Sequence, residues 1–433
     1  MIINRPKYLV RLASSRLNGK MKLITGISQC GKTFFMFNIY KAWLNSIGIP
    51  NSDIIVIPLN EEEFSKYRNP YKLGRYIRER TIDTRRQFYV FIDGIEYITE
   101  ARIPAKAGAA SEKYGIVNVM EALRSIYNAD FYVIGDDTKL LQDEVSPDYK
   151  EWTETISVHP LSYEEFYNSY SGPKQNAWHE YTTYGGLPLL QSLKDHAEKN
   201  IYLQGLIDRI YIPRVMRRDR VKNSEETMRE LLGIIASSSG ELTNPNLIAD
   251  KLNEKRRKRF SNKTISDYKD SLENSFLISR LERFSISGKH FIGSPYKYYF
   301  SDCGLRNAAV NFSYQEDERI MENVIFNELQ LRGYEVEAGV LEYNWKDKKG
   351  HSHRDNLGID FIAIKDEKKI YIQTALSVES EKIREAEIAP LMRIKDSFKR
   401  IVVTADPGAP WTDANGIQYI NIEEFLLKEN LDK

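Results

Sequence analysis

Short apolar runs alternate with longer amphipathic stretches through the first part of the chain. The runs are rich in β-branched and aromatic residues, as is typical of strands buried in a parallel sheet. The stretches between them have the length and apolar spacing of helices. This alternation predicts an α/β domain over residues 1–170, with a doubly wound, mostly parallel sheet. The predicted strands are 23–24, 53–59, 87–93, 131–135 and 155–158.

The middle of the chain changes to three helical periods followed by an aromatic strand. In the third period, Ile265, Tyr268, Leu272 and Phe276 fall on one stripe of a helix. The order helix, helix, helix, hairpin predicts a winged helix-turn-helix. The segments are a helical linker at 171–225 and, within the winged helix at 226–305, helices at 228–237, 245–252 and 263–277 and a strand at 296–301.

Five consecutive basic residues stand just before the third of these helices. Such a run can hold DNA phosphates while the helix lies in a major groove. A solvated basic surface is the alternative, and both remain open. The whole chain favours neither, because 62 Lys and Arg nearly cancel 61 Asp and Glu. The run consists of Lys255, Arg256, Arg257, Lys258 and Arg259.

The last third of the chain, 306–433, mixes helices and strands in another order. The pattern predicts helices at 318–332 and 381–398 and strands at 335–338, 358–364, 369–376 and 400–404. This order resembles the core of restriction-endonuclease-like proteins. The resemblance implies an α/β domain built to hold a metal beside a phosphodiester.

In that fold a helix Glu, a strand-end Asp and an E-x-K or Q-x-K pair cut phosphodiesters. Glu322 and Asp360 match the first two positions and Gln373 the third, but Ala375 stands where the lysine belongs. Without the ammonium group the attacking water loses its activator, and Gln removes an anionic ligand from the metal. We therefore expect a degenerate nuclease-like domain without nuclease activity. Its acidic pair is a relic, a weak metal site or exposed surface.

A glycine-rich segment follows the first apolar run. Gly26, Gly31, Lys32 and Thr33 match G-x-x-x-x-G-K-[ST] without a substitution, between a predicted strand and a predicted helix. Glycines let the loop turn its N–H groups toward a polyphosphate, and the helix directs its positive dipole end at it. Lys32 would reach the terminal phosphates and Thr33 would offer its hydroxyl to Mg²⁺. The loop predicts ATP binding through Gly26, Ile27, Ser28, Gln29, Cys30, Gly31, Lys32, Thr33 and Phe34.

Polar residues end the third and fourth apolar runs. The third ends in Asp93, which is typical of a Walker B strand that brings a carboxylate to the metal. Many related ATPases place Glu next, whereas this chain has Gly94, so Glu96 is the candidate to polarise water, with a solvated helix-start residue as the alternative. After the fourth run, Asp137 or Thr138 is the candidate sensor of the γ-phosphate. The candidate catalytic residues are thus Lys32, Asp93 and Glu96, and the Mg²⁺ ligands are Thr33 and Asp93.

Two further features concern location. Cys30 and Cys303 lie far apart in sequence, which suits a reducing cytosol. No run of 18 apolar residues and no cleavable leader pattern occurs. We expect a soluble, cytoplasmic protein.

Several motifs together resemble one family. They are the phosphate loop, DGIE at 93–96, IGDDTKLL at 134–141, VHPLSYEEF at 158–166 and YTTYGGLP at 181–188. They are similar to bacterial and archaeal AAA-type ATPases that carry an uncharacterised C-terminal module. In that family a G-R pair commonly precedes P-L-S-x-x-E-F, whereas this chain offers only Lys150 there.

The resemblance implies an ATP-binding and ATP-hydrolysing switch that uses Mg²⁺. Its nucleotide state would be coupled to a winged-helix and nuclease-like module that binds double-stranded DNA or a protein partner. The alternative is a DNA-binding regulatory or defence protein that binds ATP and hydrolyses little of it. An active nuclease is the least expected outcome, and monomeric and oligomeric states stay open.

Overall fold

The computed structural model describes residues 2–99, 101–102, 113–136, 149–218, 225–254, 259–313, 316–346 and 351–428. The chain divides into two compact units. The first comprises Met1–Pro160 with Asn274–Phe276, and the second comprises Leu161–Glu273 with Leu277–Lys433.

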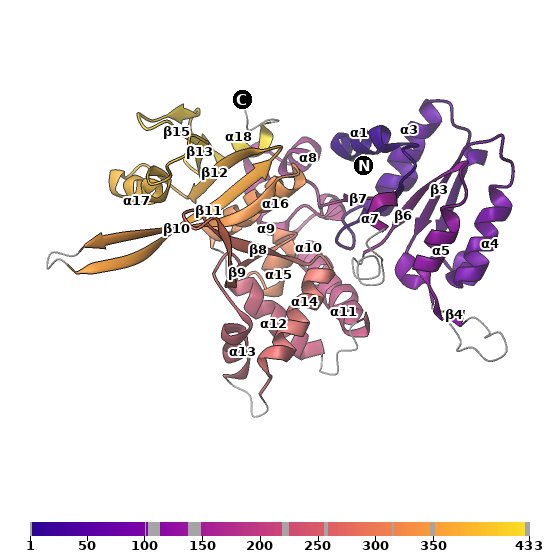
Figure 1. Ribbon diagram of the computed structural model, residues 1–433, viewed down its shortest axis with the longest axis horizontal. Coiled ribbons are helices and arrows are strands. Elements are labelled where there is room, and N and C mark those ends of the chain that lie inside the picture. The colour runs from indigo at the N-terminus through magenta and orange to yellow at the C-terminus, as the bar shows by residue number, and fades with distance from the viewer. Residues whose placement is uncertain are drawn as a thin grey trace. The chain divides into compact units, whose positions relative to one another are not determined.

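Five parallel strands form the centre of the first unit (Figure 1). Their order is β2-β3-β6-β1-β7, and each neighbouring pair is parallel. Each strand covers one of the predicted apolar runs, so the predicted parallel sheet is confirmed. The strands are β1 (Met21–Thr25), β2 (Ile54–Pro58), β3 (Phe88–Asp93), β6 (Ala129–Ile134) and β7 (Thr153–Ser157).

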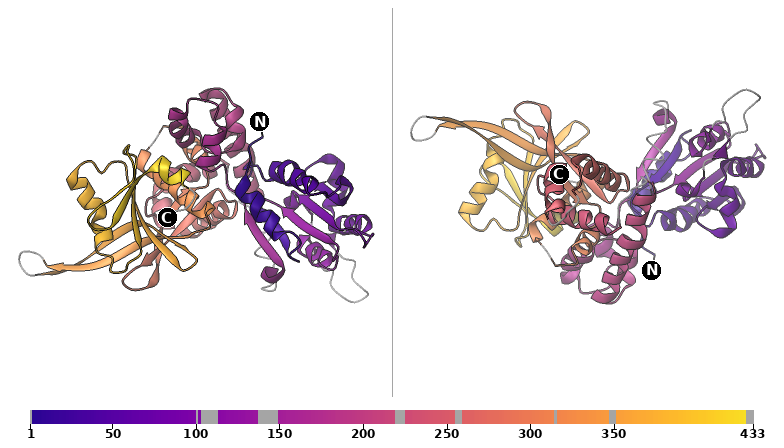
Figure 2. Two further views of the ribbon diagram at one scale, coloured as in Figure 1. Left: turned by 90° about the horizontal axis from the view of Figure 1, so that it is seen from above. Right: turned by 90° about the horizontal axis from the view of Figure 1, so that it is seen from below.

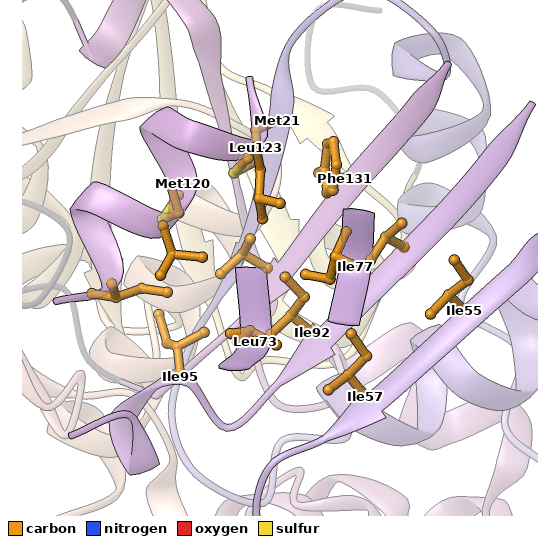
Figure 3. Close-up of a cluster of buried hydrophobic side chains, with 14 of the residues drawn as sticks. Met21, Ile55, Ile57, Leu73, Ile77, Ile92, Ile95, Met120, Leu123 and Phe131 are labelled. Carbon is orange, nitrogen blue, oxygen red and sulfur yellow. The ribbon is translucent and has the colours of Figure 1, made fainter. Parts of the chain in front are cut away.

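One face of this sheet carries a largely aliphatic core. Alternate strand residues point to the same face, which places residues such as Ile57 and Ile92 side by side. Leu73 of helix α4 (Pro70–Arg80) and Met120 of helix α5 (Ile116–Leu123) cover them, as Figure 3 shows.

The opposite face is aromatic and polar. The ring of Tyr40 packs on Phe91 and Tyr132, with centroids 5.9 and 5.2 Å apart. Tyr40 ends a π-helical stretch, η1 (Phe35–Tyr40), between α2 (Lys32–Phe34) and α3 (Lys41–Ser46). Buried Lys22 forms an ion pair with Asp130 (2.6 Å) on this face. Helices therefore cover both faces, as in a doubly wound sheet.

The other elements of this unit are α1 (Pro6–Ser15), η2 (Asn51–Asp53), η3 (Glu62–Arg68), η4 (Ile95–Tyr97), β4 (Ala101–Arg102), β5 (Lys113–Tyr114) and α7 (Tyr149–Trp152).

The second unit begins with a helical region and continues into the predicted three-helix segment. The order of three helices and a hairpin is as predicted. The helices are α8 (Tyr163–Ser169), η5 (Lys174–Asn176), α9 (Ala177–Tyr184), η6 (Pro188–Ser192), α10 (His196–Leu206), η7 (Ile207–Tyr211), α11 (Ile212–Arg218), α12 (Glu225–Ser237), α13 (Pro245–Asn253), α14 (Asn262–Asn274) and α15 (Cys303–Ala309).

The hairpin after α14 is part of a larger sheet. It consists of β8 (Ile278–Ser285) and β9 (His290–Phe300), and β8 pairs in parallel with β10 (Glu335–Lys346). The strand order is β14-β15-β13-β12-β11-β10-β8-β9. The sequence assigned this hairpin to a module separate from the last third of the chain. The structure instead joins the two through one continuous sheet.

A long hairpin extends from this sheet, formed by β10 and β11 (Ser352–Lys365) (Figures 1 and 2). We predicted only 335–338 and 358–364 as strands. Their outer parts pair with each other, for example Glu342 with Asn356. Polar residues dominate this outer part, so the apolar pattern does not reveal the strands.

The remaining elements complete the C-terminal sheet and its helices. The predicted helix over 381–398 ends earlier, at Met392. The apolar core here includes Tyr371, Leu391 and Val402. The elements are α16 (Asp317–Leu331), β12 (Lys368–Ala375), α17 (Glu381–Met392), β13 (Lys399–Thr404), β14 (Trp411–Thr412), β15 (Ile417–Asn421) and α18 (Ile422–Leu427). Among the described residues, no helix has the length and apolar character needed to cross a membrane.

Candidate functional site

The phosphate loop connects β1 to α2 at the carboxyl edge of the first sheet. Its backbone has positive φ at Gly26 (139°), Gln29 (66°) and Gly31 (97°). A Cβ on Gly26 would stand 2.0 Å from the carbonyl oxygen of Val158. The first glycine of the motif is therefore required by close packing of the loop against the residue after β7.

The ammonium group of Lys32 is already fully engaged. Its Nζ donates to the carbonyl oxygens of Gly26 (2.9 Å) and Ile27 (2.8 Å) and forms an ion pair with Asp136 Oδ1 (2.5 Å). Burial disfavours the charge on Lys32, but several neighbouring groups, Asp136 first among them, together outweigh it and raise the pKa of Lys32 to about 12. Lys32 therefore stays charged, held by the loop and by one carboxylate.

The two predicted Mg²⁺ ligands lie together. The Thr33 hydroxyl donates to Asp93 Oδ2 at 2.7 Å, and Asp93 is the last residue of β3. Burial raises the pKa of Asp93, while the hydrogen bond from Thr33 lowers it and the nearby Asp136 raises it further. A hydroxyl and a carboxylate thus meet where the sequence placed them, beside Lys32.

Glu96 lies close to the end of β6. Its Oε2 is 3.7 Å from where a Cβ on Gly135 would stand, and its negative charge helps to raise the pKa of Lys32. Gly94 has a positive φ of 78°. Its Cβ would meet the Tyr97 ring at 3.1 Å and the Asn60 nitrogen at 3.4 Å. The position that holds Glu in many related ATPases is therefore built for glycine here.

The polar residue that reaches Lys32 from the end of β6 is Asp136. We predicted Asp137 or Thr138 for this role, and both lie outside the described residues. The strand β6 ends at Ile134, one residue earlier than we predicted. With the correct end, the sequence would have favoured Asp136 over Asp137.

Arg5 is a second residue that sequence reasoning missed. It is only 4% exposed and donates to the carbonyl oxygens of Cys30 (3.2 Å), His159 (2.9 Å) and Pro160 (3.1 Å). Arg5 therefore ties the phosphate loop to the segment after β7. Its position before a proline-led helix gave no local signal of this contact.

Cys30 is a packed residue of the loop. Its thiol donates to the Val158 carbonyl oxygen at 3.2 Å, and burial raises its pKa. The thiol therefore stays protonated.

In the second unit, Glu322 of α16 and Asp360 of β11 lie on either side of one lysine. Lys297 Nζ of β9 is 3.2 Å from Glu322 Oε2 and 3.5 Å from Asp360 Oδ1. The structure places these two predicted carboxylates beside one cation, and nothing in the sequence pointed to Lys297.

The other two positions of the predicted relic lie on β12. Gln373 donates through Nε2 to Glu387 Oε2 at 3.1 Å. Ala375 is 2% exposed and belongs to the apolar core, so it offers no chemistry. No group of three or more His, Cys, Asp or Glu side chains in the described part of the chain is arranged to hold a metal ion.

Most of the basic run before α14 lies outside the residues that the structure describes. Residues 255–258 lie outside the described residues, and Arg259 is exposed. The structure therefore leaves the DNA contact a prediction.

The residues of the first site fit Mg²⁺ and a nucleotide. The loop has no room for a side chain at Gly26, and one lysine, one hydroxyl and one buried carboxylate surround its end. Thr33 and Asp93 would hold Mg²⁺, and Lys32 would face the phosphates.

Two family models match the chain. Residues 18–167 match a family described as an AAA domain, and residues 175–316 match a domain of unknown function (DUF8612). Together with the loop geometry, the first match shows that the first unit carries an AAA-type P-loop domain.

Similar proteins occur in a bacterium and an archaeon. An uncharacterized protein of Haemophilus influenzae is 28% identical over 432 residues, which is 99% of this chain and 99% of that protein. An uncharacterized protein of Methanocaldococcus jannaschii is 25% identical over 385 residues, covering 84% of this chain and 77% of that protein. Neither name carries a function.

Solved structures show weaker similarity. A Walker-type ATPase of Pyrococcus abyssi has a TM-score of 0.48 and 15% identity, covering 71% of this chain and 96% of that chain. The ORC1 protein of Aeropyrum pernix, solved in complex with DNA, has a TM-score of 0.27 and 13% identity, covering 71% and 92%. These scores are too low to support an argument, so the assignment depends on the AAA family match.

Proposed function

We propose that the protein is a cytoplasmic, ATP-dependent switch that hydrolyses ATP slowly. In this proposal the AAA-type domain at 1–170 acts on a module made of a helical linker (171–225), a winged helix (226–305) and a degenerate nuclease-like domain (306–433). That module binds a partner macromolecule in one nucleotide state.

The ion pair between Lys32 and Asp136 carries this proposal. In P-loop proteins the lysine at the position of Lys32 faces the phosphates. Here its Nζ lies 2.5 Å from Oδ1 of Asp136, which follows the neighbouring strand β6. A bound polyphosphate competes with Asp136 for the same ammonium group. Nucleotide binding therefore releases Asp136, and this exchange is the event that a switch can transmit.

We expect slow ATP hydrolysis because of the residues near the phosphate loop. Gly94 removes the carboxylate that many related ATPases place after the Walker B aspartate. In this proposal Glu96, whose Oε2 lies near Gly135, is the carboxylate that accepts a proton from water. Bound Mg²⁺ would supply charge neutralisation at the phosphates, and Thr33 and Asp93 would fix its position.

A single-turnover ATPase assay tests the enzyme part of the proposal. The full-length protein should convert ATP to ADP faster than Lys32→Ala, which removes the ammonium group. Wild-type hydrolysis at the Lys32→Ala background would reject it. ATP binding without hydrolysis would instead support the alternative, a DNA-binding regulatory or defence protein that holds nucleotide.

For the partner, we favour a protein over DNA. In a winged helix the third helix reads the major groove, and here that helix is α14. Its exposed residues Lys263, Asp267 and Asp270 are spaced by four and three positions, so they lie on one face of the helix. Two of these three side chains are carboxylates. A further basic residue, Lys269, is 4% exposed and forms ion pairs with Asp270 and Glu273. Such a face repels phosphates.

The DNA alternative rests on the basic run at 255–259. A duplex-DNA mobility shift at low salt, lost when Lys255 to Arg259 are replaced by Ala, would favour DNA and contradict our choice. Absence of any shift, with and without ATP, agrees with a protein partner. We also propose that the C-terminal domain lacks nuclease activity. Plasmid cleavage with Mg²⁺ that is lost in Asp360→Ala would contradict that.

A further inference from the structure

The acidic pair of the C-terminal domain contains a cation supplied by the chain itself. Lys297 of β9 lies between Glu322 of α16 and Asp360 of β11, at 3.2 and 3.5 Å. The three side chains are only 16%, 12% and 14% exposed. An ammonium group this well shielded persists only when its charge is compensated. The two carboxylates provide that compensation.

Neutral donors hold each carboxylate in a fixed orientation. The Tyr299 hydroxyl donates to Glu322 Oε2 at 2.8 Å. Thr374 donates to Asp360 Oδ2 through its backbone N–H (2.9 Å) and its hydroxyl (2.8 Å). Across the described residues, Lys297 is the cation that forms an ion pair with either acid. The pair is therefore pre-organised around one positive charge.

Two further carboxyls lie within the electrostatic reach of this pair. Burial and the charge of Asp360 raise the pKa of both Glu318 and Glu387, which places these two carboxyls in the same electrostatic environment. In addition, the buried Oε1 of Gln373 has no hydrogen-bond partner within the described structure. Carboxylate and amide oxygens in such a setting are the donors that hard divalent cations prefer.

We propose that Lys297 is a built-in counter-ion that occupies the place of a divalent cation between Glu322 and Asp360 and so keeps metals out. A divalent cation would have to displace the ammonium group from between the two carboxylates. The domain thereby keeps the acidic residues of a metal site without the metal. This inference does not depend on ATP binding or hydrolysis.

Manganese binding to the full-length, nucleotide-free protein tests the proposal, with free Mn²⁺ measured by electron paramagnetic resonance. Lys297→Met removes the charge and keeps the chain length. We expect it to bind one more Mn²⁺ than the wild type, roughly tenfold or more tighter than any wild-type binding at this site. The double variant Lys297→Met with Asp360→Asn should lose that gain. Lys297→Arg, which keeps a positive charge, should behave as the wild type.

Two results would overturn the proposal. One is Mn²⁺ binding by the wild type that Asp360→Asn abolishes, because the pair would then hold metal beside Lys297. The other is a folded Lys297→Met protein, judged by circular dichroism, that gains no Mn²⁺. If Lys297→Met does not fold, Lys297→Gln takes its place, and the comparison of wild type with Asp360→Asn still decides the first result. All variants share the same phosphate loop, so its metal binding cancels.

Discussion

At the level of single residues, the charge next to Lys32 is the one that a bound nucleotide would compete with. Asp136 holds the ammonium group at 2.5 Å, and the loop carbonyls of Gly26 and Ile27 complete its shell. An anionic ligand must therefore replace an existing ion pair. Nucleotide affinity depends on the difference between two interactions of Lys32 and not on one alone.

Replacing Asp136 by Asn should tighten nucleotide binding. The competing charge disappears while the shape of the side chain stays, so we expect the dissociation constant of a fluorescent ATP analogue to fall roughly three- to tenfold. Single-turnover hydrolysis should not accelerate, because no water-activating group is added. Asp83→Asn, which removes an exposed carboxylate paired with Arg85, is the matched control. Weaker binding by Asp136→Asn would show that this carboxylate serves the nucleotide and does not compete with it.

Restoring the carboxylate after Asp93 should not produce a fast ATPase. Gly94 has φ of 78°, and its Cβ would approach the Tyr97 ring at 3.1 Å. Gly94→Glu should therefore lower the free energy of unfolding by about 1–2 kcal/mol, seen as a lower melting temperature, without a large gain in hydrolysis rate. Tyr97→Ala combined with Gly94→Glu relieves the clash and separates it from the backbone strain. A substantial rate increase in Gly94→Glu alone would contradict this account.

The sequence predicts those site residues that belong to a local motif, and it does not predict those whose partners are distant in sequence. The phosphate loop, Thr33 and Asp93 lie on one strand-loop-helix unit and one strand end, so spacing and periodicity suffice. Arg5 and Lys297 reach their partners across 154 and 25 residues of sequence. Their roles depend on packing that no local pattern encodes.

At the level of elements, the motifs that carry the family resemblance are largely structural. In VHPLSYEEF, Ser162 and Glu165 form a capping box at the start of α8. In YTTYGGLP, the backbone N–H of Gly186 donates to the buried Asp302 carboxylate at 2.7 Å. A Cβ on Gly185 would stand 2.1 Å from the same carboxylate. The glycine pair of YTTYGGLP therefore fixes the junction between α9 and α15, whereas VHPLSYEEF fixes the start of α8.

The stability of this junction should depend on pH through Asp302. Burial raises the pKa of Asp302 to about 6, although backbone N–H groups such as that of Leu305 lower it. The folded state then binds its proton more tightly than the unfolded state. The free energy of unfolding of the second unit should fall by roughly 2–3 kcal/mol as the pH rises from about 4 to about 6.

Hydrogen exchange followed by mass spectrometry measures this effect on segments 181–188 and 303–309. Asp302→Asn should remove the pH dependence and should also lower stability, because its amide meets backbone donors in place of an acceptor. An unchanged slope in that variant would assign the effect to other carboxyls.

At the level of the whole chain, one continuous eight-stranded sheet joins the β8–β9 hairpin to the strands of the last third of the chain. Apolar periodicity located most of the strands in this part of the chain. It did not reveal that β8 pairs in parallel with β10, because strand pairing between distant segments leaves no mark in either segment. Strands on both sides of the predicted boundary near residue 305 therefore belong to the same sheet.

A proline in the shared strand should destabilise both sides together. Val340 pairs with Ser285 of β8 and with Gly358 of β11, and Pro removes a backbone donor in a central strand. In Val340→Pro, hydrogen exchange should increase in β8, β9, β11 and β12, while β3 of the first unit keeps its protection. Ser352→Pro, in the outer part of the long hairpin, should affect only that hairpin. Loss of protection confined to β10 would show that the two sides are independent.

The shared sheet also bears on how this chain can be divided in the laboratory. The match to the domain of unknown function ends at residue 316, between β9 and β10. A fragment cut there would leave the edge of β8 at residues 283–285 without its partner strand, and would expose backbone groups that attract other chains. Such a fragment should aggregate or pair with itself, and its insolubility would say nothing about the folding of the intact protein.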